Sequence, residues 1–324
     1  MTKAVRVHEY GGTEVLSYDD VDVGDPGPGQ ARIRQAAVGL NYIDTYHRTG
    51  LYKLPSLPHT LGVEGAGEVE AVGEGVTNVK PGDKVCYGSI LGAYADTRLV
   101  PADRLLALPD GISFETAAGI MLKGMTARYL VRATYRIEAG DTVLIHAAAG
   151  GVGLIACQWA KHLGATVIGT VGSDEKAALA KAHGCDHPIL YTRENFVDRV
   201  KEITDGKGVP VVYDSVGKDT WEGSLDCLAP RGMMVSFGNA SGPVAPFSIL
   251  TLSQKGSLFL TRPTLAHYII TRAQYEETAN DLFGVVTSGA VKIEINQRYA
   301  LKDVAQAHND LESRKTTGST VLIP

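Results

Sequence analysis

The chain has 324 residues, enough for two domains that each bury a core. It carries 31 lysines and arginines against 36 aspartates and glutamates, a formal net charge of −5. This balance gives no general attraction to nucleic acid or to an anionic membrane, so we expect small molecules as partners.

Two features of the composition predict a cytoplasmic protein. The segment Met1–Tyr10 contains Lys3, Arg6 and Glu9 where a secretory leader would have a continuous apolar run. The four cysteines show neither the close spacing of a zinc knuckle nor a disulfide framework, which fits a reducing compartment. These cysteines are Cys86, Cys157, Cys185 and Cys227.

The N-terminal third is typical of a β-rich domain. Lys3–Val7, Ala31–Val38 and Glu64–Gly73 have the apolar pattern of strands. Pro26–Gly29 is a turn, and Val79–Val85 contains a Pro-Gly turn that leads into a strand. Many short strands with this spacing predict a compact, barrel-like domain.

A strand, a tight turn and a helix follow one another at residues 142–163. Thr142–His146 is apolar, Ala147–Gly153 has an Ala-x-x-Gly-Gly-x-Gly pattern, and Leu154–Leu163 has helical spacing. A helix N-terminus with small residues is a suitable site for a pyrophosphate. A glycine-rich turn without a ligand is the alternative. A second strand at Thr166–Val171 completes a βαβ unit and favours dinucleotide binding.

The residues after this second strand favour NADPH over NADH. The strand ends in Gly172 and Ser173, where NAD-binding sites usually place a carboxylate, and Lys176 follows. A hydroxyl group and a cation would accept the 2′-phosphate. Asp174 and Glu175 leave contact with a ribose open, and Lys176 could instead be an ordinary surface lysine.

Strands and helices alternate through the middle of the chain, which predicts a six-stranded parallel sheet. The expected strands are Thr142–Ile145, Thr166–Val171, His187–Leu190, Val209–Ser215, Gly232–Phe237 and Ser257–Thr261.

Several motifs, in this order, resemble the medium-chain dehydrogenase/reductase superfamily. They are Pro28-Gly29, Asn41–Asp44, Gly62–Gly67, Pro81–Val85, Ala147–Gly153, Tyr213–Gly217, Phe237–Asn239, Lys255–Ser257, Thr261–Pro263 and Ser319–Pro324. Within it the chain is similar to the zinc-independent NADPH:quinone oxidoreductases related to zeta-crystallin. The resemblance implies an α/β protein with a Rossmann doubly wound parallel sheet inserted in a GroES-like β-rich substrate domain. The expected limits are 1–123 and 263–324 for the substrate domain and 124–262 for the Rossmann domain.

The resemblance also predicts that the chain binds no metal. Asn41 lies in the region where the superfamily's alcohol dehydrogenases have a cysteine ligand, and Val63 replaces their histidine before Glu64. An isopropyl group cannot bind zinc. His47 and His59 are not expected to be ligands.

The segment in place of the zinc-ligand loop supplies the expected catalytic residues, Asn41, Tyr42, Tyr46 and Tyr52. The resemblance places Asn41 beside the nicotinamide and the tyrosines along the acceptor. The phenol groups could bond a carbonyl while the rings stack on a flat substrate, although the tyrosines could also be packing residues. We expect Asp44 to orient its neighbours.

Strand ends and the resemblance together predict the cofactor site. Lys123 is a further possible site residue, and Arg314 is expected to reach the 2′-phosphate from the C-terminal helix. The predicted NADPH contacts are Asn41, Thr126, Ala149, Gly150, Gly151, Val152, Ser173, Lys176, Tyr191, Ser215, Phe237, Gly238, Asn239 and Arg314.

The predicted function is reduction of a quinone by NADPH without a metal. Reduction of α,β-unsaturated carbonyls is the alternative, and a crystallin-like or RNA-binding relative with secondary catalysis is a further one. The apolar segment Gln254–Thr261 resembles the last strand of the sheet, whose unpaired edge predicts a homodimer.

Overall fold

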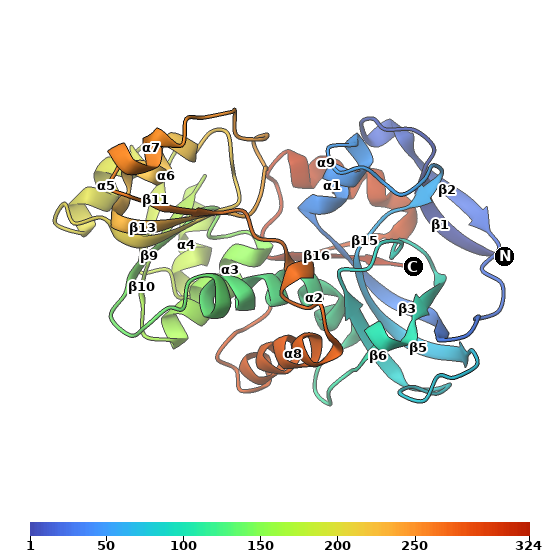
Figure 1. The fold of residues 1–324 in the computed structure, drawn as a ribbon. Helices are drawn as coiled ribbons and strands as arrows, with labels where there is room; N and C mark the ends of the chain where they lie inside the picture. The colour runs from blue at the N-terminus through green and yellow to red at the C-terminus, as the bar shows by residue number, and fades with distance from the viewer. The chain divides into compact units, whose positions relative to one another are not determined.

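The computed structural model describes residues 1–324, and the chain forms two compact units. The first unit contains residues 1–123, 269–283 and 293–324. The second unit contains residues 124–268 and 284–292. Each unit is coloured by position in the chain in Figure 1.

The return to the first unit lies after Tyr268, six residues beyond the residue 262 expected from the sequence. Tyr268 stays with the second unit because its ring stacks on Tyr129, with centroids 4.5 Å apart, and its hydroxyl bonds the Thr134 hydroxyl at 2.8 Å. Residues 284–292 also return to the second unit, where the Lys292 amide donates to Gln158 Oε1 at 2.8 Å. The division into a substrate domain (1–123 and 263–324) and a Rossmann domain (124–262) stays a prediction.

The first unit is built mainly from antiparallel strands. Strand β3 (Gln30–Leu40) pairs with three neighbours, and residues such as Ile33 and Val38 lie fully buried in its core. The other strands are β1 (Thr2–Val7), β2 (Leu16–Val21), β4 (His59–Thr60), β5 (Glu64–Val72), β6 (Lys84–Gly88), β7 (Thr97–Pro101), β8 (Leu106–Ala107), β15 (Ile295–Ala300) and β16 (Ser319–Ile323). The helices are α1 (Tyr42–Thr49) and α9 (Val304–Glu312), with most of α8 (Arg272–Thr287) and the start of α2 (Phe114–Tyr129).

The second unit is a six-stranded sheet in which every pairing is parallel, as predicted. Its strands, in their order across the sheet, are β11 (His187–Leu190), β10 (Thr166–Val171), β9 (Thr142–Ile145), β12 (Val209–Asp214), β13 (Leu228–Ser236) and β14 (Phe259–Thr261). The last strand begins two residues later than expected, because Ser257 has a φ of 57°, which is not a strand conformation.

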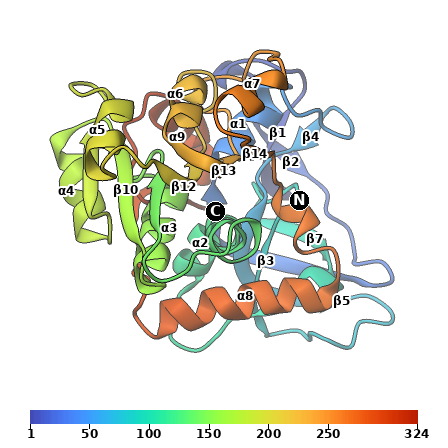
Figure 2. The ribbon, with the colours of Figure 1, turned by 60° about the vertical axis from the view of Figure 1, so that its left-hand side comes forward.

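Helices follow the strands of this sheet. Residues that are paired across neighbouring strands form the apolar surface on which side chains from the helices pack. Leu144 lies beside Ile168 on one neighbouring strand and Val212 on the other, and all three belong to the same buried hydrophobic cluster as Trp221. The helices are α3 (Gly151–His162), α4 (Asp174–Ala182), α5 (Phe196–Ile203), α6 (Trp221–Asp226) and α7 (Leu250–Gln254). Figure 2 shows α4 beside β10. No helix of the structure combines the length and apolar composition needed to cross a bilayer.

Candidate functional site

The turn between β9 and α3 has the geometry of a phosphate-binding loop. Ala147 has a φ of 53°, and its carbonyl oxygen accepts a hydrogen bond from Gly150 N at 2.9 Å. A methyl group on Gly153 would overlap that same oxygen and lie 2.9 Å from the main chain of Ala148. The absence of a side chain therefore lets the turn close against α3. The first N–H groups of a helix have no partner within it and favour an anion.

The next corner of the sheet brings together Ser173 and Lys176, the predicted 2′-phosphate contacts, and Tyr191, a further predicted NADPH contact. Ser173 is the N-cap of α4, and its Oγ accepts a hydrogen bond from the Lys176 amide at 3.3 Å. Tyr191 directly follows β11. A methyl group on Gly172 would lie 2.7 Å from the Tyr191 hydroxyl, so this phenol lies against the Gly172 main chain. Ser173, Lys176 and Tyr191 thus come from adjoining strand ends.

Asp174, which the sequence left free to face a ribose, is paired with Arg193. The Arg193 guanidinium donates from Nη1 to Asp174 Oδ1 at 3.1 Å and from Nη2 to Oδ2 at 2.6 Å. The pKa of Glu175 is lowered, chiefly by a hydrogen bond from the Ser173 side chain. Arg193 was not among the predicted site residues. The one feature of the sequence that could have indicated a role for Arg193 is its place three residues after the predicted strand His187–Leu190.

The turns after β12 and β13 lie against each other. A methyl group on Gly238 would overlap the Ser215 carbonyl oxygen, and Ala240 N donates to that oxygen at 3.1 Å. Phe237 N donates to the Asp214 carbonyl at 2.8 Å. The four predicted residues Ser215, Phe237, Gly238 and Asn239 therefore share one edge of the sheet.

A buried carboxylate holds the first of these turns. Asp214 Oδ1 accepts from the amides of Val216 at 2.8 Å and Gly217 at 3.0 Å, while Oδ2 accepts from the hydroxyls of Thr220 at 2.7 Å and Ser224 at 2.8 Å. Asp214 is fully buried, so four donors replace its lost hydration. The sequence pattern does not indicate this role, although Asp214 directly precedes Ser215.

In the first unit, the predicted acceptor-side tyrosines lie on α1 and just after it, Tyr52 three residues beyond the end of the helix at Thr49. The ring centroids of Tyr42 and Tyr46 are 5.8 Å apart, and those of Tyr46 and Tyr52 are 5.2 Å apart. The ring centroids of His47 and Tyr52 are 6.2 Å apart, and burial lowers the pKa of His47 to about 4. Neutral aromatic rings are thus arranged in one row.

Asn41, the residue before α1, is held on two sides. Its amide N donates to Asp44 Oδ2 at 2.8 Å, and its side-chain Nδ2 donates to Glu64 Oε1 at 2.7 Å. Glu64 is fully buried and also accepts from Lys123 Nζ at 2.8 Å and from Leu122 N at 2.5 Å. Lys123, named from the sequence as a possible site residue, therefore neutralises a buried carboxylate. The sequence had shown Glu64 only as part of a motif.

A chain of polar contacts runs from Asp44 to the surface of the first unit. Asp44 Oδ2 accepts from the Tyr94 hydroxyl at 2.7 Å, and that hydroxyl lies 3.3 Å from His308 Nε2. His308 Nδ1 lies 3.0 Å from Arg48 Nη1, and Arg48 Nη2 donates to both carboxylate oxygens of Glu312 at 2.9 and 3.0 Å. Burial raises the pKa of Asp44 to about 7 and lowers that of His308 to about 3. The expectation that Asp44 orients its neighbours fits these contacts.

The residues of this chain form no metal centre: no group of three or more His, Cys, Asp or Glu side chains among residues 1–324 is placed to hold an ion. Val63 is buried and follows Gly62 in the motif where the zinc enzymes have histidine. The donor set required for tetrahedral zinc is therefore lacking in the protein's own residues.

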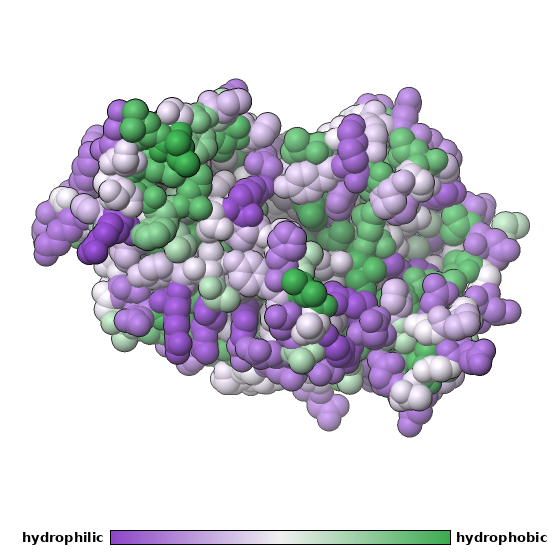
Figure 3. Space-filling model, in the orientation of Figure 1, coloured by the Kyte–Doolittle hydropathy of each residue, from purple (hydrophilic) through white to green (hydrophobic).

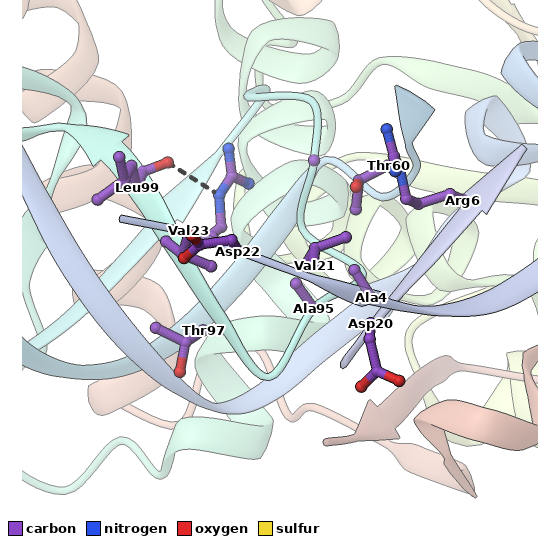
Figure 4. A pocket seen from close by; sticks show the side chains of 12 residues that line it. Ala4, Arg6, Asp20, Val21, Asp22, Val23, Thr60, Ala95, Thr97 and Leu99 are labelled. Atoms are coloured by element: carbon purple, nitrogen blue, oxygen red, sulfur yellow. Dashed lines mark hydrogen bonds between the residues drawn. The ribbon is translucent and has the colours of Figure 1, made fainter. Parts of the chain in front are cut away.

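A cavity of about 480 Å³ in the first unit is separate from all these groups (Figure 4). It is lined by parts of β1, β2 and β7, and none of the predicted site residues lines it. Arg98, one of its polar residues, already donates to the Leu91 carbonyl at 2.7 Å and the Ile90 carbonyl at 3.3 Å. We therefore assign no part of the reaction to this cavity.

Comparison with known proteins gives a full-length match. The family model "Alcohol dehydrogenase GroES-like domain" matches residues 27–110, and "Zinc-binding dehydrogenase" matches residues 151–284. A quinone oxidoreductase of Pseudomonas aeruginosa is 58% identical, with all of both chains covered. This chain belongs to the quinone oxidoreductase family.

Two further proteins similar to this quinone oxidoreductase family member are named for a ligand or a reaction of their own. The crystal structure of Escherichia coli quinone oxidoreductase complexed with NADPH is 52% identical, with a TM-score of 0.98, covering 99% of this chain and 100% of that one. A 2-haloacrylate reductase of a Burkholderia species is 46% identical and covers 100% of this chain and 99% of its own. The predicted fold class, a GroES-like domain with a Rossmann sheet, is confirmed.

In this quinone oxidoreductase fold, the two units divide the predicted residues. Asn41, Tyr42, Tyr46, Tyr52 and Arg314 belong to the first unit, and the other predicted cofactor residues, Thr126 on α2 included, belong to the second. Arg314 is not in the C-terminal helix as expected. Helix α9 ends at Glu312, and Arg314 follows it with a φ of 60°, where its amide bonds the Leu311 carbonyl at 3.1 Å. The contacts of all these residues with NADPH stay predictions.

Proposed function

We propose that this protein reduces quinones with NADPH and without a metal. The observation that carries the proposal is the closed Ala147–Gly153 turn at the start of α3, in a chain that matches NADPH-bound quinone oxidoreductase over its whole length. The first main-chain N–H groups of α3 are the kind of donors that a pyrophosphate requires.

The second unit supplies most of the proposed NADPH contacts. The turn residues Ala149, Gly150, Gly151 and Val152 hold the pyrophosphate. The corner with Ser173, Lys176 and Tyr191 receives the 2′-phosphate, which the exposed Tyr191 ring covers. The remaining contacts are Thr126, Ser215, Phe237, Gly238 and Asn239, with Asn41 and Arg314 from the first unit. When bound, NADPH supplies a hydride from C4 of its nicotinamide.

The first unit supplies the acceptor side. A quinone is planar and electron-poor, so it can stack on the row of tyrosine rings. The phenol hydroxyls of Tyr42, Tyr46 and Tyr52 can donate hydrogen bonds to the oxygen on which negative charge develops. Asn41, fixed by Glu64, is held in one orientation. These groups stabilise the developing charge without a Lewis acid.

Reduction of a conjugated acid or carbonyl is the second possible function. The 46% identity with a 2-haloacrylate reductase favours it, because that name describes an acceptor with a conjugated double bond. Both acceptor classes need the same hydrogen-bond donors at a developing oxyanion. They differ in size, since a haloacrylate offers no flat ring for stacking.

The proposal includes a homodimer in a reducing, cytoplasmic environment. Strand β14 is the last in its sheet and has one neighbour, β13. Apolar side chains gather over α7 in Figure 3, where Leu250 and the adjacent Ile249 are exposed. Pairing of two such edges would cover this surface. All four cysteines are buried and unpaired, which supports a reducing compartment.

The test is steady-state oxidation of NADPH with ortho-quinones, para-quinones, enals and 2-haloacrylate, each repeated with EDTA and with NADH. We expect the highest kcat/KM with a quinone, no loss with EDTA and a preference for NADPH. Tyr52→Phe should lower kcat for quinones roughly tenfold, since one hydrogen bond to charge is lost. Tyr18→Phe is the matched control, because Tyr18 lies on β2, is 40% exposed and is not a proposed site residue. Loss of activity with EDTA contradicts the metal-free proposal.

A further inference from the structure

We propose that Arg193 is a specificity-determining residue for NADPH, because it neutralises the carboxylate of Asp174 beside the 2′-phosphate position. This inference rests on the proposed placement of the 2′-phosphate at Ser173 and Lys176. It assigns to Arg193 a role that is separate from direct contact with the cofactor.

The position of Asp174 makes its charge relevant. Asp174 is the first residue of α4 and directly follows the N-cap Ser173. A carboxylate in the first helical turn stabilises the helix through the dipole, but the same N-terminus is where a phosphate would bind. An unpaired Asp174 would therefore repel the ligand. The bidentate Arg193 contact, at 2.6 and 3.1 Å, removes this conflict.

Hydrogen bonds to main-chain carbonyl groups hold Arg193 next to this corner. Tyr191 N donates to the Val171 carbonyl at 3.2 Å, and Thr192 Oγ1 donates to the Gly172 carbonyl at 3.4 Å. Arg193 N itself donates to the Leu190 carbonyl at 2.9 Å. The loop after β11 is thus attached to the end of β10, and the guanidinium is presented to α4 by a fixed backbone.

The charges at the corner explain why one arginine matters. Asp174 and Glu175 carry two negative charges, and Lys176 and Arg193 carry two positive ones. Removal of Arg193 leaves a net negative corner facing a phosphate of about −1.5 to −2 charges. The Asp174 and Arg193 side chains are 64% and 65% exposed, so solvent and salt reduce the interaction but do not abolish it at low ionic strength.

The first experiment measures binding of two cofactor fragments, adenosine 2′,5′-bisphosphate and 5′-AMP, by calorimetry at low salt. They differ by the 2′-phosphate alone. Arg193→Gln should weaken binding of the bisphosphate about three- to tenfold and leave 5′-AMP binding unchanged. The double variant Asp174→Asn/Arg193→Gln should restore the bisphosphate affinity. Arg199→Gln is the charge-matched control, because Arg199 pairs with Glu194 and not with Asp174.

Each result has a defined meaning. Unchanged bisphosphate binding in Arg193→Gln overturns the inference. A double variant as weak as the single one also overturns it, since Arg193 would then contact the phosphate directly. Ser173→Ala/Lys176→Gln tests the proposed corner separately: if it leaves the bisphosphate affinity intact, the corner itself is misplaced. In steady-state assays, Arg193→Gln should lower the NADPH-to-NADH ratio of kcat/KM by the same factor, and 1 M salt should reduce that change.

Discussion

At the scale of single residues, Gly153 tests the phosphate-binding turn. A methyl group there would meet the main chain of Ala147 and Ala148, which cannot move aside as a flexible side chain can. We expect Gly153→Ala to lower the free energy of unfolding by about 1–3 kcal/mol and to weaken NADPH binding at least tenfold. Gly284→Ala on α8 is the control, since a methyl group there has no neighbour within 4 Å. Urea unfolding and fluorescence titration with NADPH measure both effects, and equal behaviour of the two variants contradicts the assignment.

Asp44 and His308 are both buried and both contact the Tyr94 hydroxyl. Their shifted pKa values predict how stability depends on pH, and the sign follows from proton binding. Asp44 has a pKa of about 7 when folded, against an ordinary 3.8, so the folded chain binds more protons and stability falls between pH 4 and 7. His308 has a folded pKa of about 3, against 6.5, so stability rises between pH 3 and 6.5. The two slopes oppose each other between pH 4 and 6.5.

Replacement of Asp44 separates these contributions. Asp44→Asn keeps an acceptor for the Tyr94 hydroxyl and leaves only the His308 slope. The unfolding free energy of the variant, minus that of the original chain, should rise by on the order of 1 kcal/mol per pH unit between pH 4 and 6.5. Urea unfolding across this range gives the difference. Parallel profiles for the two proteins would show that Asp44 keeps its ordinary pKa in the folded state.

At the scale of elements, the parallel strands were predictable and their connections were not. The strands β9, β10 and β11 have the predicted bounds because each is a short segment with buried apolar side chains between turn residues. The predicted first position of β14 was wrong because Ser257 has a φ of 57°, which is not a strand conformation. The partners Glu64 and Lys123 are 59 residues apart, and such contacts have no local pattern.

The connection from β12 to α6 allows a prediction for one element. Four hydrogen bonds from this connection and from α6 end on the Asp214 carboxylate. Thr220→Val removes one donor and should cost about 1 kcal/mol of unfolding free energy. Asp214→Ala leaves four donors without an acceptor and should cost more than about 3 kcal/mol. Chemical unfolding of both variants measures the difference, and equal losses would mean that the carboxylate does not organise this turn.

At the scale of the whole molecule, the first unit depends on both ends of the chain. The Ser319 hydroxyl donates to the Gly119 carbonyl at 2.8 Å, and Arg48 pairs with Glu312 across 264 residues of sequence. Strand β16 lies between β3 and β15 in the sheet. The first unit is therefore complete only when residues 293–324 are present, whereas the parallel sheet of the second unit is contained in residues 142–261.

The proposed dimer gives the last prediction. Phe259 on β14 is 60% exposed, and a lysine in its place would put a charge into the proposed interface between two sheet edges. We expect Phe259→Lys to convert a dimer into a monomer at micromolar concentration in sedimentation equilibrium, with NADPH binding to each chain retained. Ile270→Lys is the matched control, because Ile270 is 68% exposed and belongs to the first unit. A monomer before substitution excludes the dimer, and dissociation by Ile270→Lys instead would move the interface to the first unit, away from β14, which has β13 as its one neighbour in the sheet.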